Sequence, residues 1–139
     1  MTILDTNVLS ETMLPTPSQR VLEWLAIQPV GELCTTAVTK AEILSGIARM
    51  PKGKRRRELQ DQAEGMFHED FVRGTLPFDS AAAEFYAEMM AARYAAGRIV
   101  GELDVQIAAI ARLHNATLAT RNARDIEDCG IRVVNPWEV

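Results

Sequence analysis

The sequence predicts an α/β protein built on a mostly parallel β-sheet with helices on both faces. Short apolar segments with strand character alternate along the chain with longer segments of helical periodicity, an order typical of parallel sheets. The length of 139 residues fits a single domain spanning 1–139. No repeat, low-complexity tract or linker divides the sequence. These observations together predict one layered domain.

The first elements are expected to be a strand and a helix. Residues 2–4 form a short apolar strand candidate that ends at the polar turn 5–7. Residues 16–19 have the pattern of a capping box with Pro17 at the first helical position, so a helix should run from there to near Pro29.

A second strand and a second helix should follow. The strand is expected over 32–38, and the helix should open at 39–42. Its apolar face would carry Ile43, Leu44 and Ile47. The helix should end at 50–53, where proline and glycine occur.

The second half of the chain continues this alternation. Its most regular helix is expected over 103–114, where four residues form one stripe: Leu103, Ile107, Ile110 and His114. A long helix before it should be stopped by Gly97. The other elements expected are helices at 55 to about 71, 80–96 and 122–129, and strands at 75–78, 116–120 and 131–134.

Four polar residues should meet at one edge of this sheet. In a parallel sheet the carboxyl ends of the strands share an edge, the helices begin there, and ligands bind there. Asp5 follows the first strand, and Asn122 follows the strand at 116–120. Glu42 and Asp104 lie in the first turns of their expected helices. We therefore expect these four side chains on one rim.

Such a group of carboxylates indicates a divalent cation. Carboxylates packed together repel each other, and a cation offsets that repulsion. Oxygen ligands suit Mg²⁺ or Mn²⁺ better than Zn²⁺, and neither His68 nor His114 has zinc spacing. A site of this composition is typical of metal-assisted phosphoryl transfer.

Each rim residue also has a structural alternative, which the sequence leaves open. Glu42 could complete a capping box, and Asp5 could be a turn residue. Asp104 could favour a helix N-terminus through the helix dipole. Asn122 could be an N-cap. Asp79 also follows a strand and precedes a helix, so rim position alone does not separate it from the others.

The charge distribution bears on binding of polyanions. The net charge of −4 argues against broad electrostatic binding of nucleic acid. A basic run nevertheless follows Pro51 and comprises Lys52, Lys54, Arg55, Arg56 and Arg57. Such a run is either a solvated surface or, beside a metal-filled acidic site, a contact for a polyanion.

The sequence also indicates a compartment. No apolar run approaches the ~20 residues that span a bilayer. Residues 1–10 include Asp5 and lack a basic start, so no signal peptide is expected. As free thiols, Cys34 and Cys129 suit a reducing cytoplasm. A disulfide between them is the alternative that the sequence leaves open. A cytoplasmic protein without membrane contact is expected.

Four sequence blocks resemble the motifs of PIN-domain ribonucleases, and the resemblance covers essentially the whole chain. They are I-L-D-T-N-V-L-S at 3–10, T-K-A-E-I-L-S-G at 39–46, D-V-Q-I-A-A-I-A at 104–111 and L-A-T-R-N at 118–122. Their order and spacing are similar to the VapC toxins of bacterial toxin–antitoxin pairs. The closing N-P-W at 135–137 is similar to the FitB-like branch.

The resemblance implies a PIN-like three-layer α/β/α sandwich and a Mg²⁺-dependent endoribonuclease in which Mn²⁺ can substitute. It places the catalytic, metal-binding carboxylates at Asp5, Glu42 and Asp104. The fourth position falls at Asn122, where many relatives have Asp, and Asp125 one helical turn onward is the alternative. Two further residues match polar positions beside the metal: Thr6 and Thr120.

The resemblance also implies partners. It predicts a homodimer and a cognate antitoxin that blocks the site, often by inserting a basic side chain. The antitoxin usually carries a DNA-binding domain, so any contact with DNA would be indirect. RNA would be the substrate, and the sequence does not identify its target.

Three rival functions are disfavoured by particular features. A phosphatase of the haloacid dehalogenase type needs a second Asp two residues after the nucleophile, where this chain has Asn7. A non-catalytic binding module with a decayed site is at odds with intact Asp5, Glu42 and Asp104. A nuclease for structured DNA, an activity of other PIN relatives, would need elements that this short chain lacks.

Overall fold

A five-stranded parallel sheet with strand order β3-β2-β1-β4-β5 forms the middle layer of the computed structural model, which describes residues 1–71, 73–98 and 101–139. In the register, Thr2 pairs with Leu33 on one side and with Thr117 on the other. The parallel sheet predicted from the sequence is thus confirmed. The strands are β1 (Thr2–Leu4), β2 (Leu33–Thr36), β3 (Thr75–Leu76), β4 (Thr117–Ala119) and β5 (Arg132–Val134).

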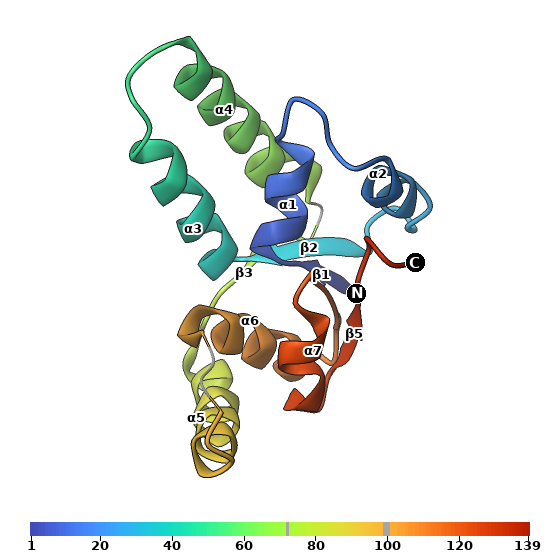
Figure 1. The fold of residues 1–139 in the computed structure, drawn as a ribbon, viewed down its shortest axis with the longest axis vertical. Helices are drawn as coiled ribbons and strands as arrows, with labels where there is room; N and C mark the ends of the chain where they lie inside the picture. The colour runs from blue at the N-terminus through green and yellow to red at the C-terminus, as the bar shows by residue number, and fades with distance from the viewer. Residues whose placement is uncertain (72, 99–100) are drawn as a thin grey trace.

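Helices cover both faces of this sheet and give the predicted α/β/α sandwich (Figure 1). One face carries α1 (Thr6–Thr12), α2 (Gln19–Ala26), α3 (Ala37–Ala48) and α4 (Lys54–Gly65), which continues into the π-helical turn η1 (Met66–Asp70). The other face carries α5 (Ser80–Ala95), α6 (Glu102–Leu113), α7 (Ala123–Ile126) and the 3-10 turn η2 (Glu127–Cys129).

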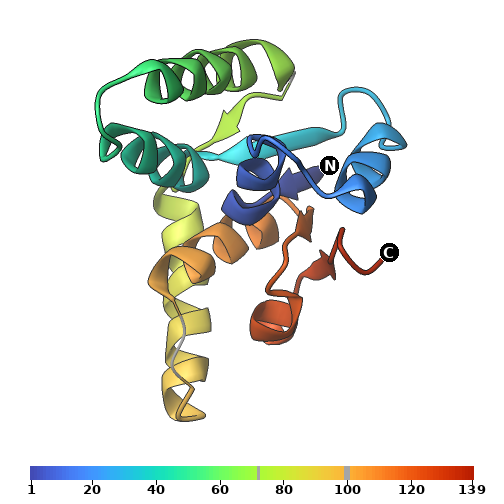
Figure 2. The same cartoon turned by 45° about the horizontal axis from the view of Figure 1, so that its top comes forward.

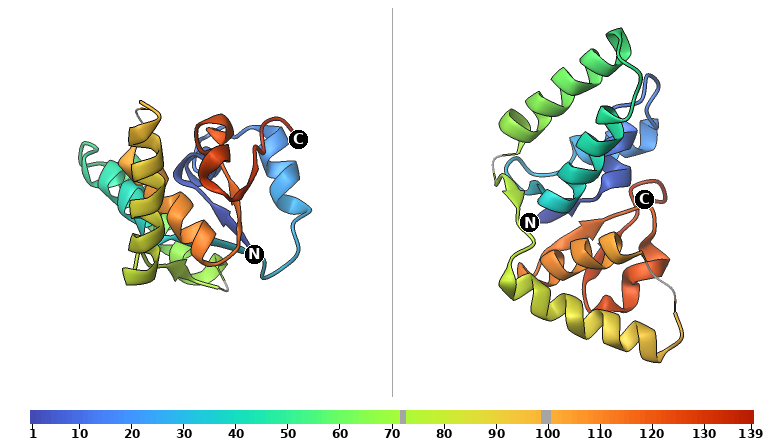
Figure 3. Two further views of the ribbon diagram at one scale, coloured as in Figure 1. Left: turned by 90° about the horizontal axis from the view of Figure 1, so that it is seen from below. Right: turned by 90° about the vertical axis from the view of Figure 1, so that its left-hand side faces the viewer.

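The two helical layers lie on opposite sides of the sheet, and α5 packs along α6 while extending away from the sheet (Figures 2 and 3). Each side has its own core, because successive residues of a strand point to opposite faces. Ile3 and Leu118 pack against the layer of α5 to α7, and Leu4 and Ala119 pack against the layer of α1 to α4. The alternating side chains of β1 and β4 therefore contribute to both cores.

The first two helices differ from the sequence predictions. Residues 5–7, predicted as a turn, include the N-cap and first residues of α1, because the Asp5 carboxylate accepts a hydrogen bond from the backbone N–H of Val8 at 3.0 Å. The capping box predicted at 16–19 is wrong. Ser18 is the N-cap residue of α2, and its side chain makes no capping hydrogen bond.

Helix α3 begins earlier than predicted. Strand β2 ends at Thr36, whose hydroxyl accepts a hydrogen bond from the backbone N–H of Thr39 at 3.1 Å and so caps the helix. The alternative in which Glu42 completes a capping box is therefore excluded, and Glu42 lies in the second turn of α3 rather than in the predicted first turn. The predicted apolar face is only partly buried, since Leu44 is 37% exposed.

The remaining elements lie close to their predicted positions. The helix predicted from 55 is α4 followed by η1, and the helix predicted at 122–129 is α7 followed by η2. In the stripe of α6, Ile107 and Ile110 are buried, whereas Leu103 is 46% exposed and His114 is exposed. Both cysteines are buried and free. None of the helices in the described part of the chain is long and apolar enough to cross a membrane.

Candidate active site

Asp5 is the most buried carboxylate at the carboxyl edge of the sheet. It directly follows β1, and only 5% of its surface is exposed. Burial, the largest effect, raises the pKa of Asp5 to about 6. Hydrogen bonds from the Thr120 side chain and the Val8 backbone N–H oppose the rise, and the negative charge of Asp104 adds to it. Thr120 is itself buried, so it fixes the carboxylate from the end of β4.

Asp104 lies in the first turn of α6, its charge acts on Asp5, and the charges of two other carboxylates act on it. Burial raises its pKa above the ordinary value, and the charges of Glu42 and Asp125 raise it further. Arg93 acts in the opposite direction. Asp104, on α6, therefore interacts electrostatically with acidic residues on both α3 and α7.

Glu42 comes from the other side of the site, on α3. Its Oε1 accepts a hydrogen bond from the Thr6 hydroxyl at 2.7 Å, and that hydroxyl also lies 3.2 Å from the Thr39 hydroxyl. Thr6 is the first residue of α1 and follows Asp5 directly. The two threonines at the rim, Thr6 and Thr120, thus each hold one carboxylate.

The donor set fits a hard divalent cation, although the carboxylates do not converge on a single point. Among the described residues, no three Asp, Glu, His or Cys side chains are grouped closely enough to hold a metal ion. Asp104 nevertheless interacts electrostatically with both Asp5 and Glu42, and the three side chains offer only oxygen donors. Burial and neighbouring negative charge disfavour the ionised forms of Asp5 and Asp104, and a bound cation would offset that cost. The shared three-carboxylate metal site stays a prediction.

Two residues are candidates for the fourth ligand of the proposed metal, and they differ in charge. Asp125 lies on α7, close enough for its charge to raise the pKa of Asp104. Asn122 is neutral, and its backbone N–H donates to the Thr120 hydroxyl at 3.1 Å. Asp79 caps α5 by accepting a hydrogen bond from the Ala82 backbone N–H at 2.9 Å. The rim criterion alone could not distinguish that role from a place in the acidic site.

The basic run after α3 is spread over the loop and the first turns of α4. Arg55 lines the same cavity as Thr6 and Glu42, and its Nη2 donates to the Met13 carbonyl at 3.1 Å. Two members lie near Glu58, with nitrogen–oxygen distances of 3.8 Å for Lys54 and 3.9 Å for Arg55. The other members are Lys52, Arg56 and Arg57.

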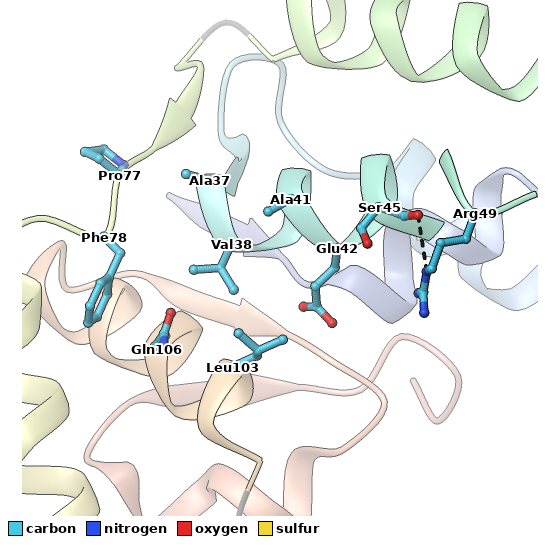
Figure 4. A pocket seen from close by; sticks show the side chains of 10 residues that line it. All are labelled: Ala37, Val38, Ala41, Glu42, Ser45, Arg49, Pro77, Phe78, Leu103 and Gln106. Carbon is cyan, nitrogen blue, oxygen red and sulfur yellow. Dashed lines mark hydrogen bonds between the residues drawn. The ribbon is translucent and has the colours of Figure 1, made fainter. Parts of the chain in front are cut away.

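Two cavities flank Glu42 on either side of α3. The larger, of about 680 Å³, lies between α3, the segment after β3 and α6. Figure 4 shows Glu42 and Leu103 facing this cavity from opposite walls, with Phe78 and Gln106 at the far end. The smaller, of about 240 Å³, lies between α1, α3 and α4. Sequence patterns did not indicate either cavity, because each depends on packing between elements distant in the chain.

Arg93 is a residue that the sequence analysis missed. Its side chain is almost fully buried on α5, and its Nη2 donates to the Asp125 carbonyl, to Asp128 Oδ1 at 2.9 Å and to Cys129 Sγ at 3.1 Å. It therefore ties α5 to the segment that carries Asp125. The available signal was a lone arginine in an alanine-rich helix.

Comparisons with known proteins agree with the geometry. Residues 2–129 match the model of the PIN domain. The chain is 40% identical to the VapC ribonuclease Y4jK of Sinorhizobium fredii and 34% identical to the toxin FitB of Neisseria gonorrhoeae, with 99% of each chain covered in both alignments. It also resembles the crystal structure of FitAcB from Neisseria gonorrhoeae, with a TM-score of 0.92, 34% identity and 100% of both chains covered.

Proposed function

The chain belongs to the PIN-domain family, and from this premise we propose that it is a metal-dependent endoribonuclease that cleaves RNA phosphodiester bonds as the toxin of a type II toxin–antitoxin system. The observation that carries the proposal is that Asp104 interacts electrostatically with three other carboxylates. Glu42 and Asp125 raise its pKa, and its own charge raises that of buried Asp5. Perturbed carboxylates at the carboxyl edge of a parallel sheet are typical of a catalytic site.

Asp5, Glu42 and Asp104 would hold Mg²⁺, with Mn²⁺ able to substitute. When bound, such an ion supplies a Lewis acid that activates water and offsets charge on the phosphate. The chain's own groups prepare the ligands, since Thr120 and the Val8 backbone N–H orient Asp5 and Thr6 orients Glu42. Asp125, or Asn122 through its amide oxygen, would complete the site from the β4 side.

RNA is the proposed substrate. The basic run is proposed to contact its phosphates, and the placement of Arg55 in a cavity shared with Glu42 supports this for that residue. Phosphate contacts by Lys and Arg give affinity that falls with salt. The five residues proposed to contact RNA are Lys52, Lys54, Arg55, Arg56 and Arg57.

A cognate antitoxin and a second copy of the chain are the proposed protein partners. The similarity to FitAcB, and the open apolar lining of the cavities beside Glu42, support an antitoxin that covers the site. The homodimer is proposed from the sequence resemblance to PIN-domain toxins. DNA would be contacted only through the antitoxin. The buried free thiols of Cys34 and Cys129 are consistent with the cytoplasm as the proposed location.

A cleavage assay with a matched pair of variants tests the proposal. The purified chain should cut RNA with Mg²⁺ or Mn²⁺ but not with EDTA. Asp104→Asn should abolish cleavage and leave the circular dichroism spectrum unchanged. Asp79→Asn makes the same chemical change at a carboxylate that caps α5, and Asn caps about as well as Asp, so this variant should stay active. Metal-independent cleavage, or an active Asp104→Asn variant, would contradict the proposal.

A further inference from the structure

A polar cavity lies on the opposite side of the acidic site from Glu42. Its volume is about 240 Å³, and it lies where β4 and β5 end, whereas Glu42 follows β2. Asp125 is one of its lining residues and is also one of the carboxylates that act on Asp104. The cavity therefore shares Asp125 with the acidic site. Its lining includes Arg121, Asn122, Arg124, Asn135 and Glu138.

Arg121 is held beside this cavity by the C-terminal segment. The guanidinium carbon lies 4.9 Å from the centroid of the Trp137 ring, and the Arg121 carbonyl accepts a hydrogen bond from Asn135 Nδ2 at 3.3 Å. Trp137 is fixed in turn, because its backbone N–H donates to Asn135 Oδ1 at 3.0 Å and its carbonyl accepts from Arg20 Nη1 at 3.0 Å. The chain therefore ends beside α2, as Figure 1 shows.

This arrangement leaves the hydrogen-bonding edge of the guanidinium available. A guanidinium held over an aromatic ring is attracted to the face of the ring, and this contact takes up none of its N–H donors. Among the ion pairs of the described residues, none involves Arg121 or Arg124. Two arginines thus line the cavity with donors that no carboxylate of the described chain takes up.

We propose that Arg121, with Arg124 beside it, binds a backbone phosphate of the RNA strand where the strand leaves the acidic site over the ends of β4 and β5. This inference rests on the proposed RNA cleavage. Phosphate is the ligand that a planar, fixed guanidinium matches best. The carboxylates of Asp125 and Glu138 border the cavity, so it suits one phosphate rather than a broad polyanion surface. With Arg55 on the Glu42 side, the strand would be held on both flanks.

Binding of a short single-stranded RNA of mixed sequence in EDTA tests the phosphate site, with fluorescence anisotropy measured over a range of salt concentrations. Arg121→Gln should weaken binding about 3–10-fold and reduce the slope of log affinity against log salt by about 0.7, the amount expected for one lost phosphate contact. Arg132→Gln is the matched control. Arg132 is exposed at the start of β5, at the amino ends of the strands and therefore opposite the acidic site. This variant should bind RNA like the wild type.

A second variant separates the position of the charge from its presence. Trp137→Leu keeps Arg121 but removes the ring that holds it, so RNA affinity should fall while the salt slope stays near that of the wild type. Trp24 and Trp137 both pack against the core on the α1 to α4 side of the sheet, so Trp24→Leu controls for loss of packing. It should not change RNA affinity when the folded fraction is equal.

The outcomes distinguish this inference from the proposed function. If the wild type cleaves RNA with Mg²⁺ but Arg121→Gln and Arg132→Gln bind RNA equally well, the phosphate site is overturned and the ribonuclease proposal stands. If the wild type neither binds nor cleaves RNA, both are overturned. A selective loss of affinity and salt slope in Arg121→Gln supports the phosphate site.

Discussion

Gly101 leaves the space that the Asp104 carboxylate occupies. A Cβ atom at position 101 would lie 3.3 Å from Asp104 Oδ2, closer than ordinary van der Waals contact. The backbone φ of −60° allows alanine, so a substitution would press on the carboxylate without straining the chain. The glycine that caps α6 therefore also determines where a proposed metal ligand can lie.

We expect Gly101→Ala to lower kcat/KM for RNA and to weaken Mn²⁺ binding in titration calorimetry, because Asp104 must shift by a few tenths of an ångström. The unfolding free energy should fall by at most ~1 kcal/mol, the usual cost of alanine at an N-cap. Gly65→Ala is the control, since a Cβ at that position meets nothing within 4 Å. Equal activity in the two variants would show that the contact with Asp104 has no catalytic consequence.

Asp125 and Asn122 compete for the role of fourth ligand, and the structure favours the charged residue. Because Asp125 acts on Asp104 and Asn122 is neutral, Asp125→Ala should reduce Mn²⁺-dependent cleavage more than Asn122→Ala. Asn122→Asp should strengthen Mn²⁺ binding measured without RNA, since it adds a carboxylate at the family position. If neither substitution changes metal binding or cleavage, three carboxylates form the whole site.

At the scale of elements, the strands were predicted well and the helix starts were not. The segments 2–4 and 131–134 are rich in apolar residues, and Ile3 and Leu4 are buried, so strand patterning located both segments. Helix α1 was missed because it is short and because its cap, Asp5, was already interpreted as a turn and site residue. At β2, the apolar Val38 seemed to extend the strand, but the hydroxyl of Thr36 starts α3 two residues earlier.

A buried arginine, Arg93, links α5 to the segment of α7 and η2 through hydrogen bonds. Arg93→Met should lower the unfolding free energy by ~2–3 kcal/mol, because it removes charge-assisted hydrogen bonds to the segment around Asp128. Within the described structure, Arg93 Nη1 has no hydrogen-bond partner. The loss in unfolding free energy should therefore be smaller than the summed contributions of the Nη2 hydrogen bonds. Denaturant unfolding at neutral pH measures the change.

The control for this prediction is Arg98→Gln. Arg98 pairs with the same Asp128 but is exposed, so its loss should cost less than ~1 kcal/mol. Equal destabilisation by the two variants would contradict a special role of burial. Arg93→Lys should recover only part of the loss, since an ammonium group cannot reproduce the planar donor geometry of a guanidinium.

At the scale of the whole molecule, the sheet topology accounts for what the sequence could predict about the site. Asp5 and Asp104 were expected on one rim because parallel strands end at one edge, and their charges do interact. The contributions of Arg93 and Arg121 could not be predicted, because each depends on how the C-terminal segment packs against α5 or α2. Periodicity within one segment carries no information about such contacts.

The acidic site should also set the pH dependence of the stability of the whole fold. Asp5 has a folded pKa of about 6, above its ordinary value of 3.8, so the folded state binds its proton more tightly than the unfolded state. This group therefore destabilises the protein increasingly as the pH rises from about 4 to above 6. Removing the charge should relieve a cost on the order of 3 kcal/mol at neutral pH.

We therefore expect the unfolding free energy of Asp5→Asn, minus that of the wild type, to be near zero at pH 4 and clearly positive at pH 7.5 in EDTA. The amide oxygen of Asn can still accept from the Val8 backbone N–H, so the cap of α1 is kept. Mg²⁺ should stabilise the wild type at pH 7.5 and leave Asp5→Asn nearly unchanged, because a cation bound only by the folded state favours the ionised carboxylate. A difference between the two proteins that does not change with pH would show that the Asp5 carboxylate is not held at a raised pKa.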